Sequence, residues 1–240
     1  MARTSKQTSF RTHSSPASSR RASTSLEKQR TPKTSPPSRP FKLTGRGQTV
    51  SSKTVYSSKT FWVTQDEVRE PCGVEATREV IRHNGSVVVL AVDDETNPKD
   101  PSVLLIRQYR HAAGKILIEL PAGRIEPGEK LIAAGKRELL EETGYRARRW
   151  SRHANYYASP GFLTETMTIL LAEGLSQGEA EPEEDEKIEV QMTPLSEVMR
   201  LIHSGRIEDG KTLIGVLLYH SLHRDKSQLS GKKSRLPARR

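Results

Sequence analysis

Short apolar runs, separated by turns rich in proline and glycine, recur through the middle of the chain. Ser86 to Val92 predicts a buried strand, Leu195 to Ser204 has helical spacing, and Thr212 to His223 predicts a last helix. Further strands are expected at Thr49 to Glu70 (as two or three short pieces), Glu75 to His83, Val103 to Tyr109, Ile116 to Leu120, Trp150 to Ser159, Thr166 to Glu173 and Ile188 to Met192. The irregular alternation of strands and helices predicts a mixed α/β fold, a sheet flanked by helices.

A charged run lies between the turn at Pro127-Gly128 and Gly144, and we expect a helix near Glu129 to Thr143. Within it, Glu141 and Glu142 follow Glu138 by three and four residues, which places the three carboxylates on one side of a helix. Like charges at this spacing repel each other unless cations lie among them. Because carboxylate oxygens suit hard divalent cations such as Mg²⁺ or Mn²⁺, the run predicts a metal site.

The positive charge of the chain lies in its two tails. Residues 1–50 carry eleven Lys or Arg and residues 224–240 carry seven, each with a single acid, whereas 51–223 contain 21 basic and 27 acidic residues. The middle, which is long enough for one domain with a proper core, is therefore acidic. The single cysteine, Cys72, excludes an intrachain disulfide and fits a reducing compartment, so we expect a cytoplasmic protein. No apolar run reaches the roughly 18–20 residues that span a bilayer, so we expect no membrane contact.

Residues 1–46 are rich in Ser, Thr, Arg, Lys and Pro and nearly free of large apolar residues. Such a segment cannot bury enough apolar surface to offset its ordering entropy, so we expect a disordered basic tail. A passive tail and a contact with nucleic acid or another acidic surface both stay open. An organellar transit peptide shares the composition, but the first residues lack the apolar face that such a peptide needs.

The acidic run also fits a known signature: glycine, five residues, glutamate, seven residues, then R-E-U-x-E-E-x-G-U, where U is an aliphatic residue. Every polar position of this pattern is present, and only Tyr145 departs, as an aromatic residue in the last slot. The stretch from Gly123 to Tyr145 therefore resembles the Nudix box. The matching residues are Gly123, Glu129, Arg137, Glu138, Leu139, Glu141, Glu142 and Gly144.

Three flanking motifs resemble the ADP-ribose pyrophosphatase branch of the Nudix hydrolases: Glu119 to Gly123, Arg107 to Arg110, and Ser159-Pro160-Gly161. The resemblance implies an α/β/α sandwich with a mixed sheet and a small N-terminal β subdomain. It also implies a homodimer that hydrolyses ADP-ribose, a nucleoside diphosphate sugar, to AMP and ribose 5-phosphate with Mg²⁺, or Mn²⁺. The domain prediction is a tail at 1–46, a β subdomain for dimerisation at 47–82, a Nudix domain at 83–223 and a disordered basic tail at 224–240.

The resemblance also implies roles for single residues. The metal ligands would be the Ala122 carbonyl, Glu138 and Glu142, assisted by Glu141, and Arg137 would hold a box carboxylate in place. The acidic loop before Ile188 would add Glu186 as a ligand and Glu184 as the base, although its register is open and a merely solvated loop is the alternative.

Three further residues would contact the substrate. Trp62 would stack on adenine, with a place in the core or the dimer interface as the alternative. Arg110 would reach a phosphate or the terminal ribose, and Glu119 would accept a hydrogen bond from a ribose hydroxyl.

Two other functions compete with ADP-ribose hydrolysis. One is a pyrophosphatase acting on another nucleotide sugar such as GDP-mannose. The other is a non-catalytic Nudix-fold sensor held on nucleic acid by its tails. The intact polar box argues against the sensor, because a pure binding module has no need of clustered carboxylates.

Overall fold

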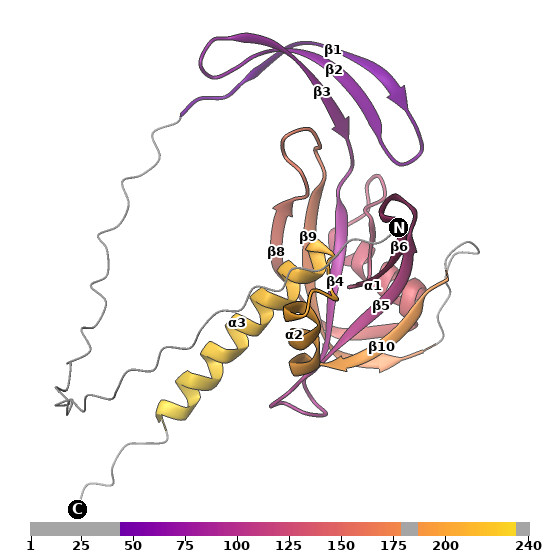
Figure 1. Cartoon of the computed structure of the whole chain (residues 1–240), viewed down its shortest axis with the longest axis vertical. Helices are drawn as coiled ribbons and strands as arrows, with labels where there is room; N and C mark the ends of the chain where they lie inside the picture. Colours follow the sequence, from indigo (N-terminus) through magenta and orange to yellow (C-terminus); the bar gives the residue numbers. More distant parts are fainter. Residues whose placement is uncertain (1–43, 179–186, 234–240) are drawn as a thin grey trace, which may run out of the picture. The chain divides into compact units, whose positions relative to one another are not determined.

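Two β-sheets and three α-helices form the described part of the chain, residues 44–178 and 187–233, with the backbone alone for 224–233, in this computed structural model (Figure 1). The first sheet is antiparallel, in the order β1-β2-β3. Its strands are β1 (Gln48–Ser57), β2 (Trp62–Arg69) and β3 (Glu75–Arg82). Every residue of β1 is exposed, so this sheet has little core of its own.

The second sheet has seven strands in the order β10-β5-β4-β9-β8, with β6 beside β5 and β7 beside β4. Strands β4 and β9 are parallel and the other pairs antiparallel, so the sheet is mixed, as expected. The strands are β4 (Ser86–Asp93), β5 (Ser102–Arg110), β6 (Lys115–Glu119), β7 (Ala122–Arg124), β8 (Tyr145–Tyr157), β9 (Thr166–Gln177) and β10 (Glu189–Pro194), and a 3-10 turn, η1 (His111–Ala113), joins β5 to β6.

Strand β4 is the centre of the core because both of its faces are covered. Successive side chains of a strand point to opposite faces. Val88, Leu90 and Val92 pack with residues of α2 (Leu195–His203) and α3 (Gly210–Lys233). The alternating Val87, Val89 and Ala91 pack with α1 (Leu131–Thr143), through Ala134 and Leu139 among others. The α/β/α sandwich is thus confirmed.

Several element boundaries differ from the prediction, and one strand was missed. Helix α1 begins at Leu131, because Glu129 still belongs to the turn, where its N–H donates to the Glu126 carbonyl at 2.9 Å. Strand β7 was not predicted, since three residues carry no periodicity. The backbone of α3 is helical to Lys233, which corrects the helix end expected at His223. The stretch beyond His223 contains no proline and several residues that favour a helix.

No helix in the described ranges combines the length and apolarity that a bilayer crossing requires.

Candidate active site

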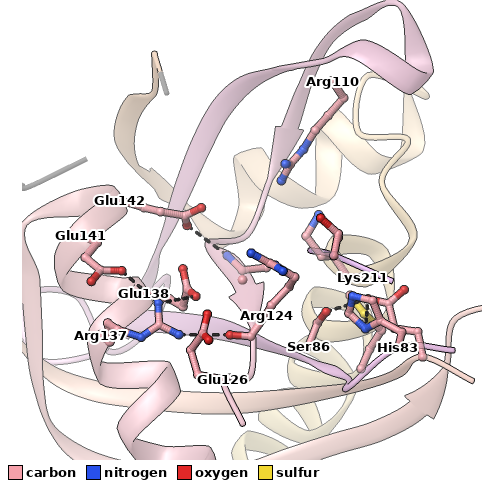
Figure 2. A pocket seen from close by; sticks show the side chains of 15 residues that line it. His83, Ser86, Arg110, Arg124, Glu126, Arg137, Glu138, Glu141, Glu142 and Lys211 are labelled. Carbon is pink, nitrogen blue, oxygen red and sulfur yellow. Dashed lines mark hydrogen bonds and ion pairs between the residues drawn. The ribbon is translucent and has the colours of Figure 1, made fainter. Parts of the chain in front are cut away.

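The acidic residues of α1 converge on the wall of a cavity of about 370 Å³ (Figure 2). Glu138 and Glu142 are 8% and 4% exposed, while the Glu141 side chain beside them is 38% exposed. The helix ends at Gly144, which adopts φ +73° and donates its N–H to the Leu140 carbonyl. A glycine takes this left-handed conformation without steric cost, so α1 stops just past the acids.

Strand β7 brings its backbone against two of these carboxylates. A Cβ atom on Gly123 would lie 2.0 Å from the Cδ and Oε1 atoms of Glu138, so only glycine admits this carboxylate here. The N–H of Ala122 donates to Oε2 of Glu142 at 3.0 Å. The pairing of β7 with β4, with Val87 opposite Gly123, fixes this backbone against the core.

Arg137 is shared by three carboxylates. Its Nε and Nη2 donate to the two oxygens of Glu129, both at 3.1 Å, and its Nη1 donates to Glu138 at 2.8 Å and Glu141 at 3.0 Å. The hydrogen bonds to Glu129 are the main reason that the pKa of Arg137 is raised, and they hold the pKa of Glu129 below its usual value. Three carboxylates around one guanidinium leave an excess of negative charge that a bound cation would offset.

Across the cavity lies a second charged group, in which Arg110 and Lys211 face the acids of α1 (Figure 2). Arg110 donates from Nε and Nη2 to the two oxygens of Glu119 at 2.9 and 2.7 Å. Lys211 donates to Oε2 of the same carboxylate, and Glu119 is only 1% exposed. Burial alone would raise the pKa of Glu119, but the hydrogen bonds and charges of Arg110 and Lys211 hold it below its usual value.

A third wall is formed where β3 passes into β4. Ser86 donates from Oγ to Oε1 of Glu165 at 2.6 Å, and the N–H of Gly85 donates to Nδ1 of His83 at 3.0 Å. His83 Nδ1 lies 3.7 Å from Glu165. These contacts orient Glu165 at the cavity.

The cavity gathers most, though not all, of the expected site residues. The lining residues include Ala122, Gly123, Arg137, Arg110 and the three glutamates at 138, 141 and 142. Trp62, on β2, is 36% exposed and does not line the cavity in the described structure, so adenine stacking stays a prediction. Glu184 and Glu186 lie outside the described residues.

Sequence reasoning missed several lining residues: Thr60, His83, Ser86, Arg124, Glu126 and Lys211. Lys211 belongs to the Asp-Gly-Lys-Thr start of α3, whose sequence signals a helix cap but no site. Only the tertiary fold places it beside Glu119.

The donor set of the α1 wall fits a hard divalent cation. The buried carboxylates of Glu138 and Glu142 approach the β7 backbone, and every candidate ligand atom is an oxygen. Within the described ranges, no three acidic, His or Cys side chains are grouped closely enough to hold an ion by themselves. A hard divalent cation can bind through one or two carboxylates, with waters and substrate phosphates completing its shell.

The chain is similar to known proteins in sequence and in fold. Residues 82–214 match the family model described as NUDIX domain. The chain is 34% identical over 171 residues to the ADP-ribose pyrophosphatase of Bacillus subtilis (strain 168), covering 70% of this chain and 90% of that protein. It is 36% identical over 159 residues to the GDP-mannose pyrophosphatase of Cronobacter sakazakii, covering 59% of this chain and 79% of that protein. A crystal structure of an ADP compounds hydrolase shares the fold, with a TM-score of 0.66, 22% identity, and coverage of 78% of this chain and 98% of that one.

Proposed function

Because the chain belongs to the Nudix hydrolase family, we propose that it hydrolyses the diphosphate of ADP-ribose to AMP and ribose 5-phosphate. The observation that supports this best is the approach of Glu138 and Glu142 to the β7 backbone on one wall of a cavity whose other wall presents Arg110 (Figure 2). The pyrophosphatase from Bacillus subtilis, named for ADP-ribose, supports the choice of substrate.

The reaction depends on a divalent cation, in this proposal Mg²⁺, with Mn²⁺ as its substitute. The ion would be held by the carbonyl of Ala122 and by Glu138 and Glu142, with Glu141 assisting and Glu186 added from the acidic loop. When bound, such a cation neutralises phosphate oxygens and makes a coordinated water more acidic.

The protein's own residues then orient the reactants and move the proton. Arg137 fixes Glu138 and Glu141 through its Nη1, so that both carboxylates keep one geometry. Glu184 takes the proton of the attacking water. Arg110 binds a phosphate or the terminal ribose of the substrate, while Trp62 stacks on adenine.

The active form is a homodimer, and the exposed apolar side chains of the first sheet support this. Val50, Val55 and Tyr56 of β1 are 61%, 53% and 54% exposed. Burial of such residues between two copies would give the first sheet the core that it lacks. The free, exposed thiol of Cys72 supports a cytoplasmic location, where it stays reduced.

GDP-mannose is the second candidate substrate, because the chain is also similar to a GDP-mannose pyrophosphatase. A hydrolysis panel tests both: ADP-ribose, GDP-mannose and other nucleoside diphosphate sugars, each with Mg²⁺ and with a chelator, and products identified by mass spectrometry. We expect AMP and ribose 5-phosphate, formed fastest from ADP-ribose and only with the cation. If GDP-mannose is cleaved faster than ADP-ribose, GDP-mannose is the substrate instead. If no nucleoside diphosphate sugar is cleaved, the proposed function is wrong.

A further inference from the structure

The buried carboxylate of Glu119 lies between two cations from distant parts of the chain. Both of its oxygens accept from Arg110, at 2.9 and 2.7 Å, and Oε2 also accepts from Lys211. The side chains of Glu119 and Lys211 are 1% and 9% exposed. A carboxylate removed from water to this extent is stable only when cations and donors surround it, so each member of the group depends on the others.

Lys211 is itself fixed by the first turn of α3. Its Nζ lies 3.0 Å from Oδ1 of Asp209, and Oδ2 of Asp209 caps the helix by accepting from the N–H of Thr212 at 3.0 Å. The hydroxyl of Thr212 accepts from the N–H of Leu120 at 2.8 Å. The start of α3 therefore holds both the side chain of Glu119 and the backbone of the next residue.

This anchorage determines how Arg110 enters the cavity. Glu119 occupies the Nε and Nη2 side of the guanidinium, a two-point contact that fixes its plane. The hydrogen bond to Glu119 raises the pKa of Arg110 above its ordinary value. Figure 2 shows the guanidinium of Arg110 pointing into the cavity, across from the acids of α1.

Lys211 is poorly placed to act as a substrate-binding cation in its own right. Its ammonium contacts two carboxylates, those of Glu119 and Asp209, which compensate its charge. Together with Arg110 the group holds two cations and two anions. The effect of this group is to hold Arg110 in one orientation.

We propose that Lys211, acting through Glu119, is a positioning residue that orients Arg110 for substrate binding. The inference rests on the proposed function, because Arg110 needs a nucleoside diphosphate sugar to bind. It differs from the role expected for Glu119 from the sequence, since here the carboxylate supports Arg110 and does not itself contact a ribose hydroxyl.

The test compares Lys211→Met, Arg110→Met and the double variant, with steady-state hydrolysis of ADP-ribose by the full chain in Mg²⁺. Displacing a substrate-binding group by about 1 Å can lower the kcat/KM of an enzyme on the order of 10²-fold. We therefore expect Lys211→Met to raise KM by about tenfold or more, with a smaller change in kcat. Lys211→Arg, which keeps a positively charged side chain at this position, brings the KM most of the way back to the wild-type value. The double variant is no worse than Arg110→Met alone, because Lys211 acts through that residue.

Two further variants separate positioning from folding. Glu119→Gln/Lys211→Met removes both buried charges and so avoids an unpaired one, and its KM is expected to match that of Arg110→Met. Arg200→Met is the control, because Arg200 forms an exposed ion pair with Glu197 on α2. Neither residue of this pair lines the cavity, so the control keeps the wild-type KM.

An unchanged KM in Lys211→Met, or additive effects of Lys211→Met and Arg110→Met, would overturn the inference. If the wild type still hydrolyses ADP-ribose in that case, the proposed function is unaffected. Absence of hydrolysis by the wild type in the same assay overturns both.

Discussion

The two charged walls of the cavity use the same kinds of side chain and reach opposite electrostatic results. On the α1 wall, the single guanidinium of Arg137 is shared by three carboxylates. On the facing wall, Glu119 and Asp209 balance Arg110 and Lys211. The first wall keeps negative charge that attracts a cation, whereas the second compensates its charges internally and presents an oriented guanidinium.

Charge balance decides what a cluster of ionic side chains can do. An excess of carboxylates is costly in the empty site and becomes favourable only when a cation binds. A balanced and buried cluster is stable without a ligand but strongly dependent on each of its members. Mutations should therefore affect activity most on the α1 wall and stability most on the facing wall.

The largest expected effect is that of Glu142→Gln, which removes a charge from the α1 wall without changing its shape. A bound cation contributes several kcal/mol to catalysis, so we expect kcat to fall by about 10³-fold. The measurement is steady-state hydrolysis of ADP-ribose in Mg²⁺, with circular dichroism to show that the fold is kept. Glu197→Gln, on the exposed face of α2, is the control. Near wild-type turnover in Glu142→Gln would remove the metal assignment.

A second prediction concerns Gly123→Ala, which alters the same wall through sterics alone. The added Cβ would lie 2.0 Å from the Glu138 carboxylate, so this side chain must move. Displacement of a catalytic group by about 1 Å costs on the order of 10²-fold in kcat/KM. Gly161→Ala is the control, because a Cβ there meets nothing within 4 Å. Equal activity of the two variants would show that the position of Glu138 does not matter.

A third prediction compares how much a bound cation raises the Tm in variants of the two walls. A cation at about a hundred times its Kd adds about 2.7 kcal/mol of stability, which raises the Tm by roughly 5–10 °C for a domain of this size. We expect this rise with Mg²⁺ in the wild type and in Glu119→Gln/Lys211→Met, but not in Glu138→Gln/Glu142→Gln. The check is differential scanning calorimetry with Mg²⁺ and with a chelator. A similar rise in all three proteins would place the ion elsewhere.

The smallest expected effect is the acid sensitivity of the facing wall. The pKa of Glu119 is lower in the folded state than in the unfolded chain, so its contribution is present above an unfolded pKa of about 4.3 and is lost as the pH falls through the folded value. Urea unfolding between about pH 5 and pH 3 should show a shallower loss of stability in Glu119→Gln/Lys211→Met than in the wild type, by on the order of 1 kcal/mol. Parallel curves would show that Glu119 titrates alike in both states.

The α1 wall could be predicted from the sequence, whereas on the facing wall the sequence indicated Arg110 and Glu119 but not Lys211, which joins them. Glu138, Glu141, Glu142 and Arg137 are local neighbours on one helix, so their spacing alone predicts their common face. Lys211 is 92 residues from Glu119, and only the packing of α3 on the sheet joins them. Strand β7 was missed for a similar reason, because its register comes from β4 and not from its own three residues.

In the proposed reaction, the carboxylates of α1 bind the divalent cation that hydrolysis requires. Titration of the protein with Mn²⁺, followed by electron paramagnetic resonance of the free ion, tests it without any assumption about the substrate. We predict saturable binding to the wild type and a loss of about 10²-fold or more in affinity in Glu138→Gln/Glu142→Gln, with Glu197→Gln unchanged. Equal affinity in the wild type and the double variant would contradict the account.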